Sequence, residues 1–199
     1  GYDIEAHWAA SRAHFMREGY AYVTVDCQKP GLTASTPGLK AWSPTRYSSL
    51  NISDDKYSYD IFSQAAMAVK SPSGANVMGG LAVKRIIAAG ASQSAMYLVK
   101  YYNGVHPHSR GGVFDGFFIL VGGGSLRTNL TTPAFKIFSE TEIPSGTRQA
   151  DSKVFRQWEV AGASHMPWEA ELYQAPLRKR DGIADSSTNC DKTPYSRIP

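Results

Sequence analysis

Ser92 lies in a segment whose residue types and spacing are typical of an activated serine nucleophile. The segment GASQS (90–94) follows a short apolar run at 86–89 and precedes apolar residues at helical spacing. A strand, a tight turn of small residues and a helix are the context of a G-x-S-x-G nucleophile elbow, with Ser94 in place of the second glycine. A serine that only caps the helix gives the same local pattern. The five residues alone therefore leave both interpretations open.

An activated serine needs a base, and His165 is the histidine best placed to act as one. It follows the strand expected at 155–161 directly, inside a turn of small residues. The other histidines lie elsewhere, two on the expected surface of an N-terminal helix and two beyond the elbow helix: His7, His14, His106 and His108. A lone histidine is more often structural than catalytic, so the position of His165 is the argument for it.

The base in turn needs a carboxylate to orient it, and two glutamates follow the apolar run at 134–138. Glu142 is the preferred candidate because it is farther from the strand end, where its side chain can turn towards a neighbouring loop. Glu140 is the alternative, and either could be an ordinary surface residue. The chain order of Ser92, Glu142 and His165 is the Ser…Asp/Glu…His order of α/β-hydrolases.

The elements that must position these residues alternate between strands and helices. We expect helices over 3–18 and 57–69, a helix after Ser92, and irregular chain from Pro176 onward. The expected strands are 20–25, 86–89, 117–121, 134–138 and 155–161. This alternation predicts an α/β fold with a mostly parallel sheet, helices on both faces, and a site at the carboxyl ends of the strands.

A long segment at 29–56 is rich in Pro, Gly, Ser and Thr and reads as a loop at the rim of the site. Trp42 and Tyr47 within it are the residues expected to shape the substrate pocket.

The composition is that of an ordinary globular domain. A chain of 199 residues fits a single domain, 1–199, and its 42% hydrophobic and 19% charged residues are typical values. The net charge of +4 is scattered, which argues against a nucleic-acid face, and no apolar run approaches the roughly 20 residues of a membrane span. No His, Cys and Asp cluster has ligand spacing, so we expect no metal and no cofactor. The oligomeric state is not indicated.

Cys27 and Cys190 can form a disulfide in an oxidising compartment or remain as two thiols. Two glycosylation sequons, at 51–53 and 129–131, favour a secreted or periplasmic location over a cytoplasmic one.

Several sequence blocks together resemble an α/β-hydrolase-fold family, the "alpha/beta hydrolase domain" proteins. The blocks are 19–23 with Gln28, 46–50, 57–64, 90–95, 140–142, 158–162 with His165, and Pro194 with 196–199. The resemblance covers nearly the whole chain. It implies that Ser92 is the nucleophile and His165 the base. The family's acid is most often Asp, whereas this chain carries Glu142.

The resemblance also implies missing parts. In this fold, a strand that supplies half of the oxyanion hole precedes the helix expected at 3–18, and it would pair between the 20–25 strand and the elbow strand. We therefore expect the sequence to be a segment of a longer protein, truncated at both ends. The backbone N–H of Gln93 is the remaining oxyanion donor.

The expected function is cleavage of small-molecule or lipid-like carboxylic esters by a serine esterase through an acyl-enzyme intermediate. An acyltransferase or thioesterase with the same triad and a catalytically silent binding domain are the alternatives.

Overall fold

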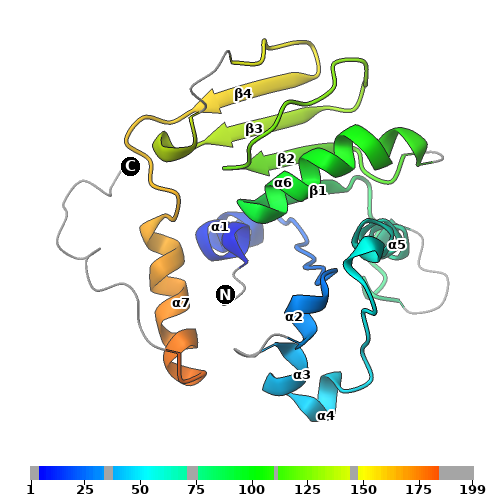
Figure 1. The fold of residues 1–199 in the computed structure, drawn as a ribbon, viewed down its shortest axis with the longest axis vertical. Coiled ribbons are helices and arrows are strands. Elements are labelled where there is room, and N and C mark those ends of the chain that lie inside the picture. The colour runs from blue at the N-terminus through cyan, green and yellow to red at the C-terminus, as the bar shows by residue number, and fades with distance from the viewer. Residues whose placement is uncertain (1–4, 34–37, 71–75, 110–111, 144–147, 184–199) are drawn as a thin grey trace.

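The computed structural model describes residues 5–33, 38–70, 76–109, 112–143 and 148–183, and these form a parallel sheet of four strands with helices around it (Figure 1). The strands are β1 (Ile87–Ala91), β2 (Gly116–Leu120), β3 (Ala134–Phe138) and β4 (Phe155–Glu159), in the spatial order β1-β2-β3-β4. β1 and β2 are short apolar runs, the pattern of a strand that is buried on at least one face, and β3 is apolar apart from Lys136. The outer strand β4 is mostly polar. The predicted parallel α/β fold is confirmed.

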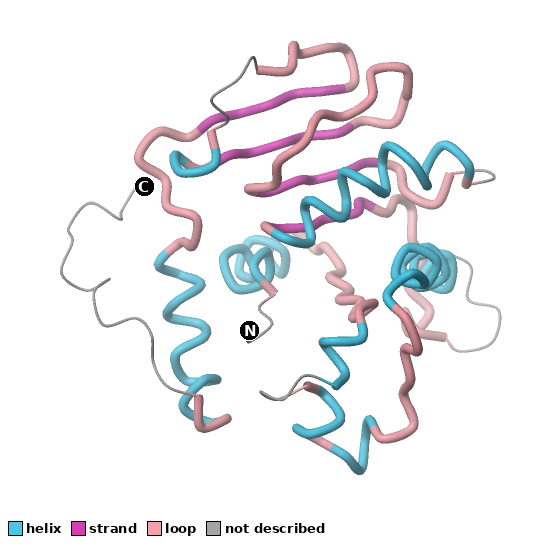
Figure 2. Tube along the Cα trace, viewed as in Figure 1, coloured by secondary structure: helices cyan, strands magenta, loops and turns pink. Residues whose placement is uncertain are grey.

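Helices precede, connect and follow these strands (Figure 2). They are α1 (Ala6–Arg17), α2 (Lys29–Thr33), α3 (Leu39–Trp42), α4 (Pro44–Tyr47), α5 (Ser58–Lys70), α6 (Gln93–Lys100) and α7 (Trp168–Arg180). Short helical turns are η1 (Asp55–Tyr57), the π-helical η2 (Tyr101–Val105), η3 (His106–His108) and η4 (Glu140–Glu142). The expected rim loop at 29–56 thus contains three short helices.

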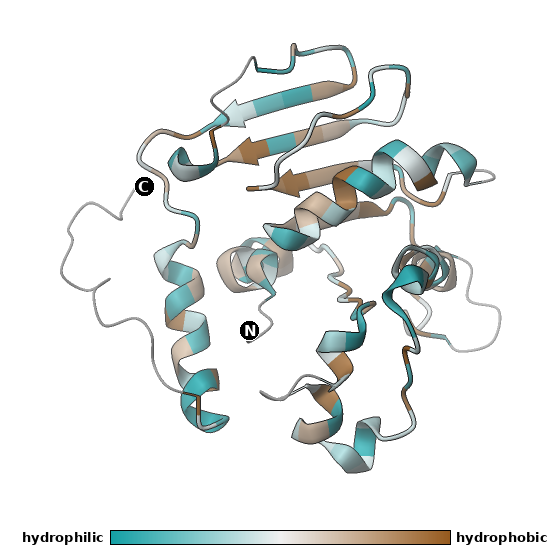
Figure 3. Cartoon of the chain, in the orientation of Figure 1, coloured by the Kyte–Doolittle hydropathy of each residue, from teal (hydrophilic) through white to brown (hydrophobic). Residues whose placement is uncertain are grey.

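The core lies between the sheet and α6. Ala88, Phe117, Ala134 and Phe155 are paired across the four strands and are all buried. Paired residues on neighbouring strands point to the same face, so they form one apolar row beneath α6. On α6 and the turn after it, the buried residues facing this row are Ala95, Leu98, Val99, Tyr101 and Tyr102. Figure 3 shows β2 coloured apolar along its length.

The opposite face of the sheet is only partly covered. His7 of α1 packs edge-on against Phe118, with ring centroids 5.2 Å apart, which places α1 on the face opposite α6. Phe118 stacks on Phe135, and Phe135 meets the ring of Trp158 at 4.9 Å. Trp158 is nevertheless 60% exposed. Helices therefore contact both faces, as predicted, but apolar side chains towards β4 remain open on the α1 side.

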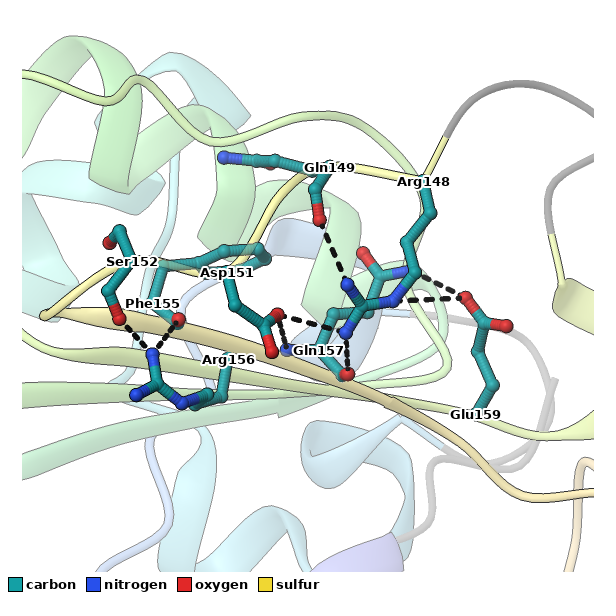
Figure 4. Close-up of polar contacts among 8 residues, drawn as sticks. All are labelled: Arg148, Gln149, Asp151, Ser152, Phe155, Arg156, Gln157 and Glu159. Carbon is teal, nitrogen blue, oxygen red and sulfur yellow. Dashed lines mark hydrogen bonds and ion pairs between the residues drawn. The ribbon is translucent and has the colours of Figure 1, made fainter.

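Polar side chains close the outer edge of β4 (Figure 4). Arg148 donates to the carbonyl of Gln157, and the N–H of Gln157 donates to Asp151 at 3.3 Å. Arg148 also forms ion pairs with Asp151 at 2.8 Å and Glu159 at 3.7 Å. An edge strand whose backbone groups bind charged side chains is a poor template for another strand.

The expected strand at 20–25 does not form, and this prediction was wrong. Tyr20 to Val25 has no strand assignment, and both Tyr20 and Val23 are largely exposed. A run of β-branched and aromatic residues favours a strand only where a neighbouring backbone can pair with it. The described residues provide no such neighbour at this position.

The expectation of irregular chain from Pro176 was also wrong for residues 176–180, because α7 continues through Pro176 to Arg180. Residues 184–199, which the same expectation covers, lie outside the described residues. Proline in a helix interior costs about 3 kcal/mol, so other contacts must offset it. Within α7, Arg178 is buried and bonds to Gln174 and Glu171 at 3.0 and 2.6 Å. The helix also packs on α1, where the guanidinium of Arg12 lies 4.7 Å from the ring centre of Tyr173.

Candidate active site

Ser92 joins the end of β1 to the start of α6 in a strained backbone conformation. Its φ and ψ angles are 55° and −118°. These lie near the mirror image of the first central position of a type II turn, at about +60° and −120°, which normally requires glycine. The N–H of Ser92 donates to the carbonyl of Leu120 at 3.0 Å, and its carbonyl accepts from Met96 at 3.1 Å. Strand and helix hold the strained residue from both sides.

Small residues are required around this turn for a steric reason. A Cβ atom built on Gly90 would lie 2.9 Å from the backbone carbonyl atoms of Ser94. One built on Gly122, in the loop after β2, would lie 2.2 Å from the Cβ of Ala95. The first turn of α6 therefore packs directly against the backbone of two neighbouring segments, and this packing fixes where Ser92 stands.

Gln93 is the first residue of α6. The N–H of a first helical residue has no carbonyl partner one turn earlier in its helix, and the helix dipole is positive at this end. Such a group can donate to an anionic oxygen that develops beside Ser92.

His165 and Glu142 form a direct pair. The Nδ1 atom of His165 lies 2.5 Å from Oε1 of Glu142. Glu142 belongs to η4, which follows β3, and His165 lies in the turn that leaves β4, so two neighbouring strand ends supply the pair. A carboxylate at Nδ1 places the proton there and leaves Nε2 as the acceptor.

Two hydroxyl groups hold the carboxylate of Glu142. Ser139 donates to Oε2, and Thr141 donates to Oε1 at 2.7 Å. Partial burial alone would raise the pKa of Glu142, but the hydrogen bonds from Ser139, Thr141 and His165, with the charge of a protonated imidazole, lower it below its ordinary value of 4.5. Glu142 is therefore ionised at neutral pH. The sequence interpretation missed both hydroxyl residues, although hydroxyls and glutamates alternate in Ser-Glu-Thr-Glu (139–142).

Glu140, the alternative acid, has different partners. Its Oε2 accepts the backbone N–H of Gly162 at 2.5 Å, and its own N–H donates to the carbonyl of Ala163 at 3.0 Å. Of the two glutamates in η4, it is Glu142 that contacts the imidazole.

Ser92, Glu142 and His165 all follow carboxyl ends of strands in one parallel sheet, as the arrowheads of Figure 1 indicate. Within the described part of the chain, no hydrogen bond is recorded between the Ser92 hydroxyl and His165. His165 is 42% exposed, so its ring has a free side towards solvent. Hydrogen bonds of this kind are often long before substrate binds.

Two of the other histidines, His7 and His106, are buried among core residues. His7 is buried against Phe118, so its expected surface position was wrong, and burial lowers its pKa. His106 is buried in η3, where Nε2 lies 2.7 Å from Oγ1 of Thr132 and burial again lowers the pKa. Its ring packs edge-on against Phe117 at 4.9 Å. His106 therefore belongs to the core on the side of the sheet that α6 covers.

Trp42 and Tyr47 pack on one another, with ring centroids 6.2 Å apart. Trp42 also donates from its indole nitrogen to Asp181 at 3.3 Å and lies 5.3 Å from the guanidinium of Arg180. These contacts join the 29–56 segment to the C-terminal end of α7. They are not contacts with Ser92 or His165, so a rim role for the two aromatics stays a prediction.

Among the residues that the structure describes, no group of three or more His, Cys, Asp and Glu side chains could hold a metal ion. In the same residues, no helix combines the length and apolar character needed to cross a bilayer. Cys190, Pro194 and the segment 196–199 lie outside the described residues, so the choice between a Cys27–Cys190 disulfide and two thiols stays open, and the closing block stays a prediction.

A family model described as an alpha/beta hydrolase domain matches residues 1–199. The chain belongs to this family. The family match and the four-stranded parallel sheet agree, and the expected family resemblance is confirmed. No curated protein matches the chain. The family description gives a hydrolase fold and leaves the reaction and the reacting residues to be proposed.

Proposed function

We propose that this alpha/beta hydrolase domain cleaves carboxylic esters with Ser92 as nucleophile, His165 as general base and Glu142 as the acid that orients His165. The observation that carries the proposal is the strained, positive-φ backbone of Ser92 at a strand-to-helix turn. Strain of this kind is maintained where function needs it, and a helix-capping serine needs no such conformation. The His165–Glu142 pair, which also follows carboxyl ends of strands in this sheet, supplies the base and its orienting group.

In the proposed mechanism, the Ser92 hydroxyl attacks the carbonyl carbon of the ester while Nε2 of His165 takes the hydroxyl proton. Glu142 holds the Nδ1–H and stabilises the imidazolium that forms. His165 then gives its proton to the leaving alcohol, which yields the acyl-enzyme. A water molecule, deprotonated by His165, attacks the acyl carbon. The bond between this carbon and Oγ of Ser92 then breaks, His165 returns the proton to Oγ, and the carboxylic acid is released.

The N–H of Gln93 is the proposed donor to the tetrahedral oxyanion, because it lies at the positive end of α6 next to the nucleophile. Loss of one such donor costs about 10²–10³ in rate in well-studied acyl-transfer enzymes. Trp42 and Tyr47 are proposed to line the substrate rim. Neither a metal nor a cofactor has a part in the proposed chemistry.

A catalytically silent binding domain is the second candidate, because no hydrogen bond is recorded between the Ser92 hydroxyl and His165 in the described residues. An acyltransferase or thioesterase would use the same three residues and differ only in the acceptor or in the bond cleaved.

The experiment is a kinetic screen of nitrophenyl esters of graded acyl length against the wild-type chain and two variants. Ser92→Ala should abolish turnover, whereas Ser94→Ala, two residues along the same helix turn, should retain it. Equal loss in both variants would mean that the turn tolerates no change. Turnover retained by Ser92→Ala would remove Ser92 from the mechanism. A folded wild-type chain that cleaves none of the esters would favour the silent domain.

A further inference from the structure

The turn η4 presents two carboxylates that do different things. Glu142 contacts the imidazole of His165, while Glu140, two residues earlier, binds the backbone of the segment that leads to His165. Glu140 makes two contacts with that segment, accepting from Gly162 through its side chain and donating to Ala163 through its backbone. The imidazole and its supporting backbone are thus both held from one helical turn.

The segment that carries His165 needs such support because it has left the sheet. The N–H of Val160 donates to the carbonyl of Phe138 at 3.0 Å, just beyond the paired residues of β3 and β4. The chain then turns, with Ala163 donating to the carbonyl of Val160 at 3.2 Å and Gly162 at a φ of 73°. Past this point, the contacts with Glu140 tie the turn to η4.

We propose that Glu140 is a positioning residue that fixes the turn at 160–165 and thereby sets where the imidazole of His165 stands. The consequence for turnover rests on the function proposed above, whereas the effect on the imidazole does not. A carboxylate that accepts a backbone N–H forms a charge-assisted bond, which is shorter and stronger than a neutral one.

This role differs from that of an orienting acid in how it responds to glutamine. A glutamine at 140 keeps an oxygen that can accept the N–H of Gly162. Glu140→Gln should therefore preserve this hydrogen bond, and Glu140→Ala should remove it. Glutamine at 142 is different, because an amide does not stabilise the imidazolium and can reverse the ring tautomer. The corresponding acid-to-amide change in a serine protease triad lowers kcat about 10⁴-fold.

The test compares Glu140→Ala, Glu140→Gln and Glu142→Gln with the wild-type chain, with Glu169→Ala as the control for loss of a nearby negative charge. Two quantities are measured in each. The first is kcat and KM on the best nitrophenyl ester. The second is the set of ring ¹⁵N chemical shifts of His165 across pH, which reports its tautomer and its titration without requiring turnover.

We expect Glu140→Ala to lower kcat about 10- to 100-fold at nearly constant KM, as a displaced reacting group does, and to move the His165 ring shifts towards a mixture of tautomers. Glu140→Gln should keep both kcat and the ring shifts near their wild-type values, and Glu142→Gln should change both. Unchanged ring shifts in Glu140→Ala would overturn the proposal, and so would an equal loss in Glu140→Gln. If the wild-type chain cleaves no ester, the proposed function fails and the ring shifts alone decide whether Glu140 positions His165.

Discussion

The backbone strain at Ser92 predicts that glycine is more stabilising than alanine at position 92. At position 94, in the first turn of the following helix, glycine should instead be less stabilising than alanine. We consider the pair Ser92→Gly and Ser92→Ala. Both variants lack the hydroxyl, so their difference in free energy of unfolding reports only the backbone. Alanine keeps a Cβ atom at a φ of 55° and retains the strain, whereas glycine adopts this conformation freely.

The magnitude follows from two opposing quantities. A non-glycine residue in a sparsely populated backbone region costs about 1–3 kcal/mol, and glycine relieves that cost. Glycine also loses more conformational entropy on folding, about 0.5–1 kcal/mol relative to alanine. Ser92→Gly should therefore be up to about 2.5 kcal/mol more stable than Ser92→Ala by the combination of these two ranges.

Ser94 provides the matched comparison because it lies two residues later in the first turn of α6, where the backbone is helical. Ser94→Gly should be about 0.5–1 kcal/mol less stable than Ser94→Ala. The four variants are compared by urea unfolding followed by circular dichroism, with the midpoints converted through a shared slope. If glycine destabilises position 92 as much as position 94, Ser92 is not strained, and the main argument for a nucleophile elbow is lost.

Three further predictions follow from contacts elsewhere. Gly90→Ala places a Cβ atom 2.9 Å from the backbone of Ser94, so we expect destabilisation of about 1–3 kcal/mol and loss of ester turnover together, measured by urea unfolding and kinetics. Lys136 is buried, and burial lowers its pKa to about 8, so the free energy of unfolding should rise as the pH increases from about 8 to 10, and Lys136→Met should remove this dependence. The pKa of Glu142 is lower in the folded chain than its ordinary value of 4.5, so its contribution to stability is present above 4.5 and is lost as the pH falls through the folded value. The difference in free energy of unfolding between the wild-type chain and Glu142→Gln should therefore shrink in acid.

Each of these predictions has its own control. Gly123→Ala is matched to Gly90→Ala, because a Cβ atom at Gly123 meets no neighbour within 4 Å, and equal destabilisation would refute the steric argument. For Lys136, the same pH dependence in the methionine variant would assign it to other groups. For Glu142, a stability difference that stays constant from neutral pH to pH 3 would show that its carboxylate is not held in the ionised form.

The strands β1 and β2 could be predicted because each is a continuous apolar run, and β3 is apolar apart from Lys136, whereas β4 is mostly polar. Ile87–Ala91, Gly116–Leu120, Ala134–Phe138 and Phe155–Glu159 all lie within or next to the expected segments. The run at 20–25 has the same local character and forms no strand, because a strand also needs a partner, and a partner is not a local property. Sequence pattern therefore located the strands that find neighbours and could not recognise the one that does not.

The helix α7 could not be predicted for a related reason. Its sequence shows no clear apolar stripe, and Pro176 argues against a continuous helix. The contacts that offset them lie within α7, as Arg178 does with Gln174, or on α1, as Tyr173 does with Arg12. Such contacts become visible only when the fold is known.

At the candidate site, chain order and strand ends singled out His165 and both glutamates. Glu142 was preferred to Glu140 as the acid because it is farther from the strand end. The contacts of Glu140 with the backbone at 162–163 could not be predicted, because they depend on which way its side chain leaves a single helical turn. The hydrogen bonds from Ser139 and Thr141 to Glu142 were not predicted, because serine and threonine are common in loops and their residue type alone does not indicate a partner.

The most direct test of the account is to map the covalent adduct formed when the folded chain reacts with a fluorophosphonate. The proposed triad predicts a single phosphonylated peptide that contains Ser92, with labelling lost in a folded His165→Ala variant and kept in His106→Ala. An adduct on another serine, or no adduct on a folded wild-type chain, would contradict the assignment of Ser92, Glu142 and His165 as a reacting unit.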